Sequence, residues 1–158
     1  MQREAIRERL DLNHAAAHLL DECRMVLPGI QALFGFQLIA VFNATFHDKL
    51  TPGLQQLHLA AIVLVSLAIA LVMTPAALHR QAGAQEVTSG FIRASSRLLL
   101  AGMVPLAAGI LADVYLIARL ILHADGTALA VAAIVLAAFA FLWGILPRVH
   151  RLRQALES

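Results

Sequence analysis

The chain has 158 residues, of which 60% are hydrophobic and only 14% are charged. An average soluble domain carries about 25% charged residues, so this composition excludes an ordinary water-soluble domain. The formal net charge is +2. The basic residues, however, occur singly or in short groups beside apolar blocks and form no continuous stripe, which argues against nucleic-acid binding. Composition and charge together indicate a small membrane protein.

Cysteine usage excludes further classes of protein. Cys23 is the only cysteine, which rules out an intramolecular disulfide, a CxxC redox pair and a cysteine-rich zinc site. Four-helix thiol oxidoreductases are thereby excluded. The sequence also lacks a glycine-rich phosphate loop, a nucleophile elbow and a potassium-channel selectivity filter. We therefore expect a protein that is not an enzyme and that carries no cofactor.

The first 24 residues predict an amphipathic helix on the cytoplasmic surface of the membrane. Apolar residues recur at helical spacing along one stripe, while histidines and acids share another face. The stripe consists of Leu12, Ala16, Leu19, Leu20 and Cys23, and the polar face of His14, His18, Asp21 and Glu22. No removable signal peptide is recognisable, so the first membrane span is expected to act as the insertion signal.

Four apolar blocks follow, and each is long enough to cross the bilayer as an α-helix. They cover about 25–46, 57–78, 98–121 and 127–146. At about 1.5 Å per residue, each one spans a hydrocarbon core of about 30 Å. The predicted fold is all-α, with a single four-helix transmembrane domain over residues 25–147 and a basic cytoplasmic tail over residues 148–158.

Three segments between or within the blocks carry turn and helix-end signals. Pro28 fits the first turn of the first span, where a missing N–H is harmless. Residues 50–53 have the composition of a tight turn between the first two spans. The polar connection 79–97 separates the bundle into two hairpins and is the candidate hinge.

The basic residues that flank the spans predict the orientation of the protein in the membrane. Ten of them belong to the N-terminal segment, the central connection or the tail, and only two to the hairpin turns. The ten are Arg3, Arg7, Arg9, Arg24, Arg80, Arg93, Arg97, Arg148, Arg151 and Arg153, and the two are Lys49 and Arg119. Because positively charged flanks stay inside, we expect both termini on the cytoplasmic side of a bacterial inner membrane.

Asp113 is the main candidate for a functional residue. It lies about 15 residues past the start of the third span, in the outer third of the hydrocarbon layer, where a charge costs up to about 3 kcal/mol. Gly102 and Gly109 share its helical face, so the carboxyl is expected to face a neighbouring helix and to carry a proton or bind a cation. The alternative is that the third helix ends earlier, which leaves Asp113 among the lipid headgroups or paired with Arg119 or Lys49.

Three uncharged polar residues extend this site into a predicted ion pathway. Asn43 in the first span is expected level with Asp113, while Gln37 in the first span and Ser66 in the second lie near mid-membrane. The alternative is that they form interhelical hydrogen bonds worth about 1 kcal/mol each.

Three histidines are expected at the outer surface. His47, His58 and His123 are placed there by the predicted topology, beside Asp48 and Asp125. Imidazole and carboxylate at one depth can bind zinc or act as a pH sensor. Loop histidines are more commonly solvated, so the prediction is that there is no metal site, with these three as the candidate ligands if one exists.

Three segments resemble a family of small bacterial four-helix membrane proteins that is classed as a domain of unknown function. They are 22–34 (ECRMVLPGIQALF), 74–80 (TPAALHR) and 96–102 (SRLLLAG), and the resemblance covers most of the chain from Asp21 onward. Members of that family are often labelled sodium:proton antiporters, so the resemblance implies exchange of sodium for protons.

The matching segments also predict a polar cluster at the cytoplasmic end of the bundle. Its members are Glu22, Arg24, Gln31, His79, Arg80 and Arg97. Glu22 can pair there with Arg24, Arg80 or Arg97, and the cluster then either anchors the helix ends or forms an inner gate.

The sequence leads to two hypotheses for function. The first is a small channel or transporter for protons or monovalent cations, in which Asp113 handles the charge. Because four short helices enclose little volume, its pore is expected at the axis of a homo-oligomer. The second is a non-transporting accessory or structural protein that binds a partner protein or lipid.

Overall fold

The computed structural model describes residues 2–81 and 88–148, and every regular element in this part of the chain is a helix. The elements are α1 (Gln2–Val41), α2 (Ala44–Lys49), α3 (Pro52–Gln81), α4 (Ser89–Leu122), α5 (Asp125–Phe139) and the π-helix η1 (Ala140–Ile145). Four helical segments are long and apolar enough to cross a membrane: Leu10–Val41, Pro52–Gln81, Ser89–Leu122 and Asp125–Arg148. An all-α membrane bundle with four candidate spans is thereby confirmed.

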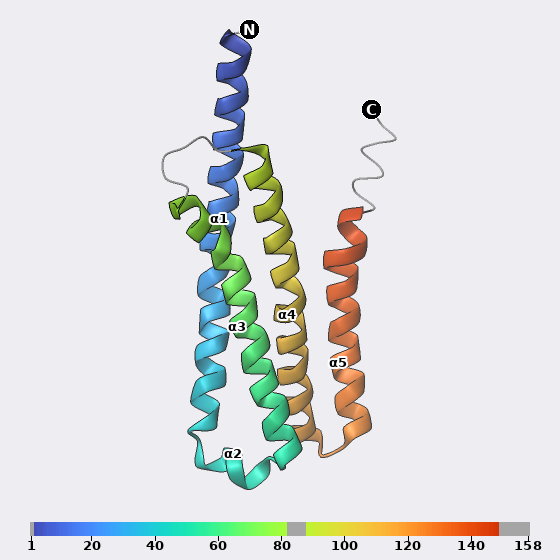
Figure 1. The fold of residues 1–158 in the computed structure, drawn as a ribbon. Coiled ribbons are helices and arrows are strands. Elements are labelled where there is room, and N and C mark those ends of the chain that lie inside the picture. The colour runs from blue at the N-terminus through green and yellow to red at the C-terminus, as the bar shows by residue number, and fades with distance from the viewer. Residues whose placement is uncertain (1, 82–87, 149–158) are drawn as a thin grey trace.

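The four long helices run alongside one another, and α2 lies across one end of the bundle beneath α1 and α3 (Figure 1). The most extensive packing is between α3 and α4, while α5 packs mainly against α4. Ala128 is the one buried residue of α5. The bundle is therefore a packed group of α1, α3 and α4 with α5 attached at its side.

Glycine and small residues bring α3 and α4 close together. A Cβ atom added at Gly109 would lie 2.8 Å from Cγ2 of Val65 and 3.2 Å from the carbonyl oxygen of Ala61. One at Gly102 would lie 3.3 Å from Cγ2 of Val72. These distances are shorter than ordinary contacts, so the helices approach this closely because side chains are absent there. The expectation that Gly102 and Gly109 face a neighbouring helix is correct, and that helix is α3.

The start of the first span differs from the prediction. Helix α1 continues through residues 24 and 25, so Pro28 lies inside it and not in a first turn. Proline is tolerated inside membrane helices because surrounding groups satisfy the freed carbonyl. Ala16 and Cys23 of the predicted apolar stripe are buried against the rest of the molecule. The segment before the predicted span is thus part of one long helix.

The first hairpin is also built differently. Helix α1 ends at Val41, not near Phe46, and Asn43 directly precedes α2, where asparagine is a favoured capping residue. The predicted turn residues Pro52 and Gly53 lie in the first turn of α3. Proline fits the first position of a helix, since its missing N–H has no intrahelical partner there.

The predicted central connection is mostly helical. Thr88 caps α4, because its Oγ1 accepts a hydrogen bond from the backbone N–H of Phe91 at 3.2 Å. Helix α3 extends to Gln81, so the connection of residues 79–97 shortens to 82–88. Residues 82–87 and the predicted tail beyond Arg148 lie outside the described residues.

Candidate functional site

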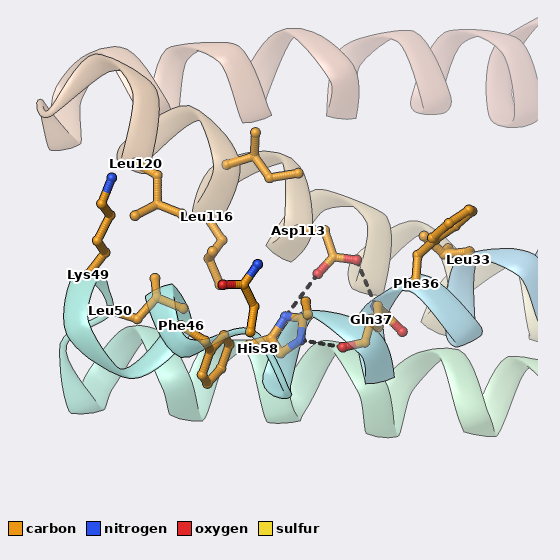
Figure 2. A pocket seen from close by; sticks show the side chains of 13 residues that line it. Leu33, Phe36, Gln37, Phe46, Lys49, Leu50, His58, Asp113, Leu116 and Leu120 are labelled. Carbon is orange, nitrogen blue, oxygen red and sulfur yellow. Dashed lines mark hydrogen bonds and ion pairs between the residues drawn. The ribbon is translucent and has the colours of Figure 1, made fainter.

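Asp113 of α4 points toward α1 and α3 (Figure 2). Nε2 of Gln37 donates a hydrogen bond to its Oδ2 at 2.7 Å. Nδ1 of His58 lies 3.6 Å from its Oδ1. The carboxylate is 15% exposed, and three helices meet at it. Asp113 therefore contacts protein groups from two other helices.

The alternative partners of Asp113 are engaged elsewhere or do not reach it. Arg119 pairs with Asp125, whose Oδ1 also accepts a hydrogen bond from the Tyr115 hydroxyl at 3.3 Å. Lys49 makes no ion pair with Asp113 in the described part of the chain and lies at the far end of the same cavity, near Leu120 (Figure 2). The interpretation that pairs Asp113 with Arg119 or Lys49 is therefore wrong.

His58 reaches Asp113 because of where α3 begins. With Pro52 as the first helical residue, His58 falls on the same helical face as Ala61 and Val65, three and seven residues later. This face packs against Gly109 of α4, and Asp113 follows Gly109 by one turn. The close approach of the two helices thus brings imidazole and carboxylate together.

The backbone of α1 fixes the other side of the imidazole. Nε2 of His58 lies 2.9 Å from the carbonyl oxygen of Gln37. A carbonyl can only accept a hydrogen bond, so Nε2 carries a hydrogen and donates it. Gln37 and His58 are 4% and 6% exposed. Gln37 therefore contacts both partners, through its side-chain amide and through its backbone.

A cavity of about 370 Å³ adjoins these three residues. Residues of α1, α2, α3 and α4 line it, and most of its wall is apolar, including Leu33, Phe46 and Leu116 (Figure 2). Such a cavity, apolar with a few converging polar groups, is the usual form of a small-molecule or ion site in a helical bundle. It gives the carboxyl of Asp113 access to a space large enough for several water molecules.

The structure brings together some, but not all, of the residues predicted for the ion pathway. Gln37 touches Asp113, and Asn43 lines the same cavity although it lies beyond the end of α1. Ser66 is exposed on another face of α3, and its hydroxyl donates to the carbonyl oxygen of Ile62 at 2.8 Å. The buried face of α3 follows residues 58, 61, 65 and 68, so a side chain one position past 65 points away from α4. Ser66 is therefore not part of the site.

The three histidines predicted at the outer surface do not converge. His58 is buried in the bundle, whereas His47 and His123 are exposed. His123 lies in the turn before α5, with Nδ1 3.1 Å from the carbonyl oxygen of Ile121. Within the residues the structure describes, no group of three or more His, Cys, Asp or Glu side chains is placed to hold a metal ion. The sequence predicts His58 only as a surface ligand, although Pro52, as a helix-start signal, is enough to place His58 on the face of α3 that contains Ala61 and Val65.

The polar cluster predicted at the cytoplasmic end is also not assembled. Among side chains of residues 10–81 and 88–148, no ion pair joins Glu22 to Arg24, Arg80 or Arg97. Arg24 instead lies 3.5 Å from Asp21 on the same exposed helix face. The remaining members have other surroundings. The His79 ring lies 5.8 Å from that of Phe91, and Glu22 lines a second cavity that Trp143 also borders. Three further members are exposed: Gln31, Arg80 and Arg97. The contacts of the described residues therefore do not join these six side chains into one site.

Comparison with known proteins gives one match. The model of a family described as "Family of unknown function (DUF6328)" matches residues 3–147. The chain belongs to this family. Gln37, His58 and Asp113 all lie inside the matched region of DUF6328. No curated protein and no solved structure matches the chain, so membership of DUF6328 confirms an uncharacterised family and brings no activity with it.

Proposed function

We propose that this protein moves protons or monovalent cations across a membrane and that Asp113 is the residue that handles the charge. The observation that carries the proposal is the placement of this carboxyl, which faces α1 and α3 beside a cavity. An ionisable side chain at membrane depth costs several kcal/mol unless it is paired, and such residues mark ion and proton pathways. Gln37 and His58 are polar residues buried beside this carboxyl, which supports a chemical role.

We also propose that the protein acts as an assembly of several copies. Between the cavity at Asp113 and the second cavity near Glu22 lies an apolar layer that includes Ile30, Leu33 and Leu106. Helix α5 has a single buried residue and presents a long apolar surface. We propose that copies associate through this surface as a homo-oligomer, with an Asp113 site inside each copy, between α1, α3 and α4.

The proposal includes an orientation and a location. The positively charged flanks favour an orientation with both termini in the cytoplasm and with the end of the bundle that contains α2 outside. Asp113 and its cavity then open toward the outer half of the membrane, and the protein resides in a bacterial inner membrane.

Ion flux into liposomes tests this function. The purified wild type is reconstituted beside Asp113→Asn, and the internal pH is followed with a dye under an imposed proton or sodium gradient. Asp48→Asn is the matched control, because Asp48 is an exposed carboxyl at the same end of the bundle that does not line the cavity. We expect flux in wild type and Asp48→Asn and at least about a tenfold loss in Asp113→Asn. Wild-type flux no greater than that of empty liposomes would reject transport.

A non-transporting accessory role is the second candidate, and the apolar surface of α5 supports it. This surface includes Leu129, Ile134 and Leu136, each more than half exposed. If a different protein covers it, photo-crosslinkers placed along α5 in cells will capture that protein and not a second copy. The two candidates thus differ in what lies against α5.

A further inference from the structure

The hydrogen-bond geometry around Asp113 leaves one proton to be assigned. Nε2 of His58 already donates to the backbone carbonyl of Gln37. In a neutral ring Nδ1 is then an acceptor. It faces Oδ1 of Asp113 at 3.6 Å, which is also an acceptor when the carboxyl is ionised. Two acceptors that face each other at this distance repel, so something with positive charge or a donor hydrogen belongs between them.

A bound sodium ion fits this gap poorly. Gln37 turns the donor end of its amide, Nε2, toward Asp113 at 2.7 Å, and an N–H directed at the carboxylate repels a cation there. Its oxygen, Oε1, is buried without a hydrogen-bond partner among the described residues and is not directed at the carboxyl. Hard cations such as sodium prefer several oxygen ligands, and of the three side chains that meet here, Gln37, His58 and Asp113, only Asp113 directs oxygen atoms into the gap.

A bridging water also fits poorly. A water that donates to two acceptors at about 2.8 Å each holds them about 4.5 Å apart. The observed 3.6 Å between Nδ1 and Oδ1 is shorter than that. It is within the range of an ion pair and needs only a small side-chain movement to become a direct hydrogen bond.

We infer that the site binds a single proton, held between Oδ1 of Asp113 and Nδ1 of His58, and that the proton, not sodium, is the ion this protein handles. The second part rests on the proposed transport function, whereas the first does not. The proton has two positions. On Nδ1 it gives an imidazolium facing a carboxylate, and on Oδ1 it gives a neutral carboxyl that donates to a neutral imidazole. Transfer between them breaks one O–H bond and forms one N–H bond, and the Gln37 contacts persist in both.

The surroundings contain few other charges. Lys49 of α2 lines the same cavity, and His47 of α2 lines a neighbouring cavity together with His58. Gln37 is the polar group that α1 contributes beside the pair. Among the described residues, α5 contributes no side chain to the cavity wall, and Arg119 of α4 is paired with Asp125. Asp113 and His58 both line the cavity, so water that enters it can deliver or remove the proton.

Nitrogen NMR of the histidine side chains tests the inference directly. The full-length protein is labelled with ¹⁵N-histidine in lipid bilayers and measured from about pH 5 to about pH 8, in sodium buffer and again with choline in place of sodium. Resonances lost in His58→Gln are assigned to His58. We expect Nε2 to stay protonated throughout, Nδ1 to be protonated or to accept a strong hydrogen bond, and neither signal to depend on sodium.

Asp113→Asn gives the matched comparison. The introduced carboxamide accepts from Gln37 through its oxygen and donates to Nδ1 through its nitrogen, so it imitates the neutral carboxyl without a transferable proton. Nδ1 is therefore expected to remain unprotonated over the whole range. If a variant does not fold, the wild-type carboxyl stretch in the infrared spectrum provides an independent measurement of whether a protonated carboxyl is present.

The outcomes separate the inference from the proposed function. A His58 signal that shifts with saturating sodium would mean that a cation occupies the gap, and a bare Nδ1 with an ionised carboxylate at every pH would mean that no proton is held there. Either result overturns the inference. The expected NMR signature with no flux in liposomes would instead retain the bound proton and reject transport.

Discussion

Nδ1 of His58 and Oδ1 of Asp113 face each other across 3.6 Å, one helical turn beyond the tight contact that Gly109 makes with Val65. The two residues are far apart in the sequence, and the packing of α3 on α4 is what joins them. Polar chemistry and helix packing are therefore coupled here, because any change that moves one helix along the other also changes the distance between imidazole and carboxyl.

The size and chemistry of the side chain at position 113 decide stability. Asp113→Ala leaves Nε2 of Gln37 without its acceptor in a buried site, and we expect a loss of about 1–3 kcal/mol in the free energy of unfolding. Asp113→Asn keeps an acceptor for Gln37 and is expected to unfold within about 1 kcal/mol of wild type. Unfolding in detergent followed by circular dichroism measures both. Equal stability of the two variants would contradict the assigned hydrogen bond.

Close packing at Gly109 predicts the effect of a single methyl group. Gly109→Ala places a Cβ 2.8 Å from Cγ2 of Val65, and we expect it to destabilise the protein by roughly 1–3 kcal/mol. The double variant with Val65→Ala should recover part of this loss. Gly35→Ala in α1 is the control, because no atom lies within 4 Å of the added Cβ and the helix gains up to about 1 kcal/mol in propensity. Similar stability losses at positions 109 and 35 would contradict the packing described.

Substitutions of Gln37 and Ser66 are predicted to have different effects on proton flux, although both residues are polar and lie within spans. Gln37→Ala removes the hydrogen bond to Asp113 and is expected to lower proton flux by about tenfold or more. Ser66→Ala removes only a bond to the carbonyl of Ile62 within α3, so its flux should equal that of wild type. Both are read in the same liposome assay, and loss of flux in Ser66→Ala would restore that residue to the pathway.

The turn between α4 and α5 contains a residue in a left-handed conformation. His123 has φ of 54°, which costs a residue with a Cβ roughly 1 kcal/mol relative to glycine. We expect His123→Gly to raise the stability of the protein by up to about 1 kcal/mol. Ala124→Gly is the control, because Ala124 is extended with φ of −139° and glycine only adds freedom to the unfolded chain. The melting temperatures of the two variants are measured by thermal unfolding. A lower melting temperature for His123→Gly than for Ala124→Gly would contradict the expectation.

Cysteine accessibility tests the proposed orientation. Cys23 is buried and is the only cysteine, so Cys23→Ala gives a background without thiols. In that background Lys49→Cys should react with a membrane-impermeant maleimide on intact cells. Arg80→Cys should react only after permeabilisation, because positively charged flanks stay inside. Both positions are exposed in the structure, so the reverse labelling pattern would show that the termini lie outside.

Local sequence patterns predicted the helices well and their ends less well. The apolar blocks are long enough to span a bilayer whatever their neighbours do, so all four were found. The ends at Pro52 and Ser89 were misplaced because proline and polar residues are compatible with both a turn and a first helical turn. At the start of α4, the hydrogen bonds that Thr88 accepts from the backbone N–H groups of Phe91 and Ile92 distinguish the two.

The sequence by itself determined that the chain is a four-helix membrane protein and that Asp113 is its unusual residue, because hydropathy and the cost of burying a charge are properties of single segments. It also paired Gly102 and Gly109 with Asp113 on one helical face. Only the tertiary structure decided that His58 and Gln37 are the partners of Asp113 and that Ser66 lies apart from them. It also decided that Arg24 pairs with Asp21 and not with Glu22. The contacts of Asp113 depend on the start and rotation of α3 against α4, which are set by packing between segments far apart in the chain.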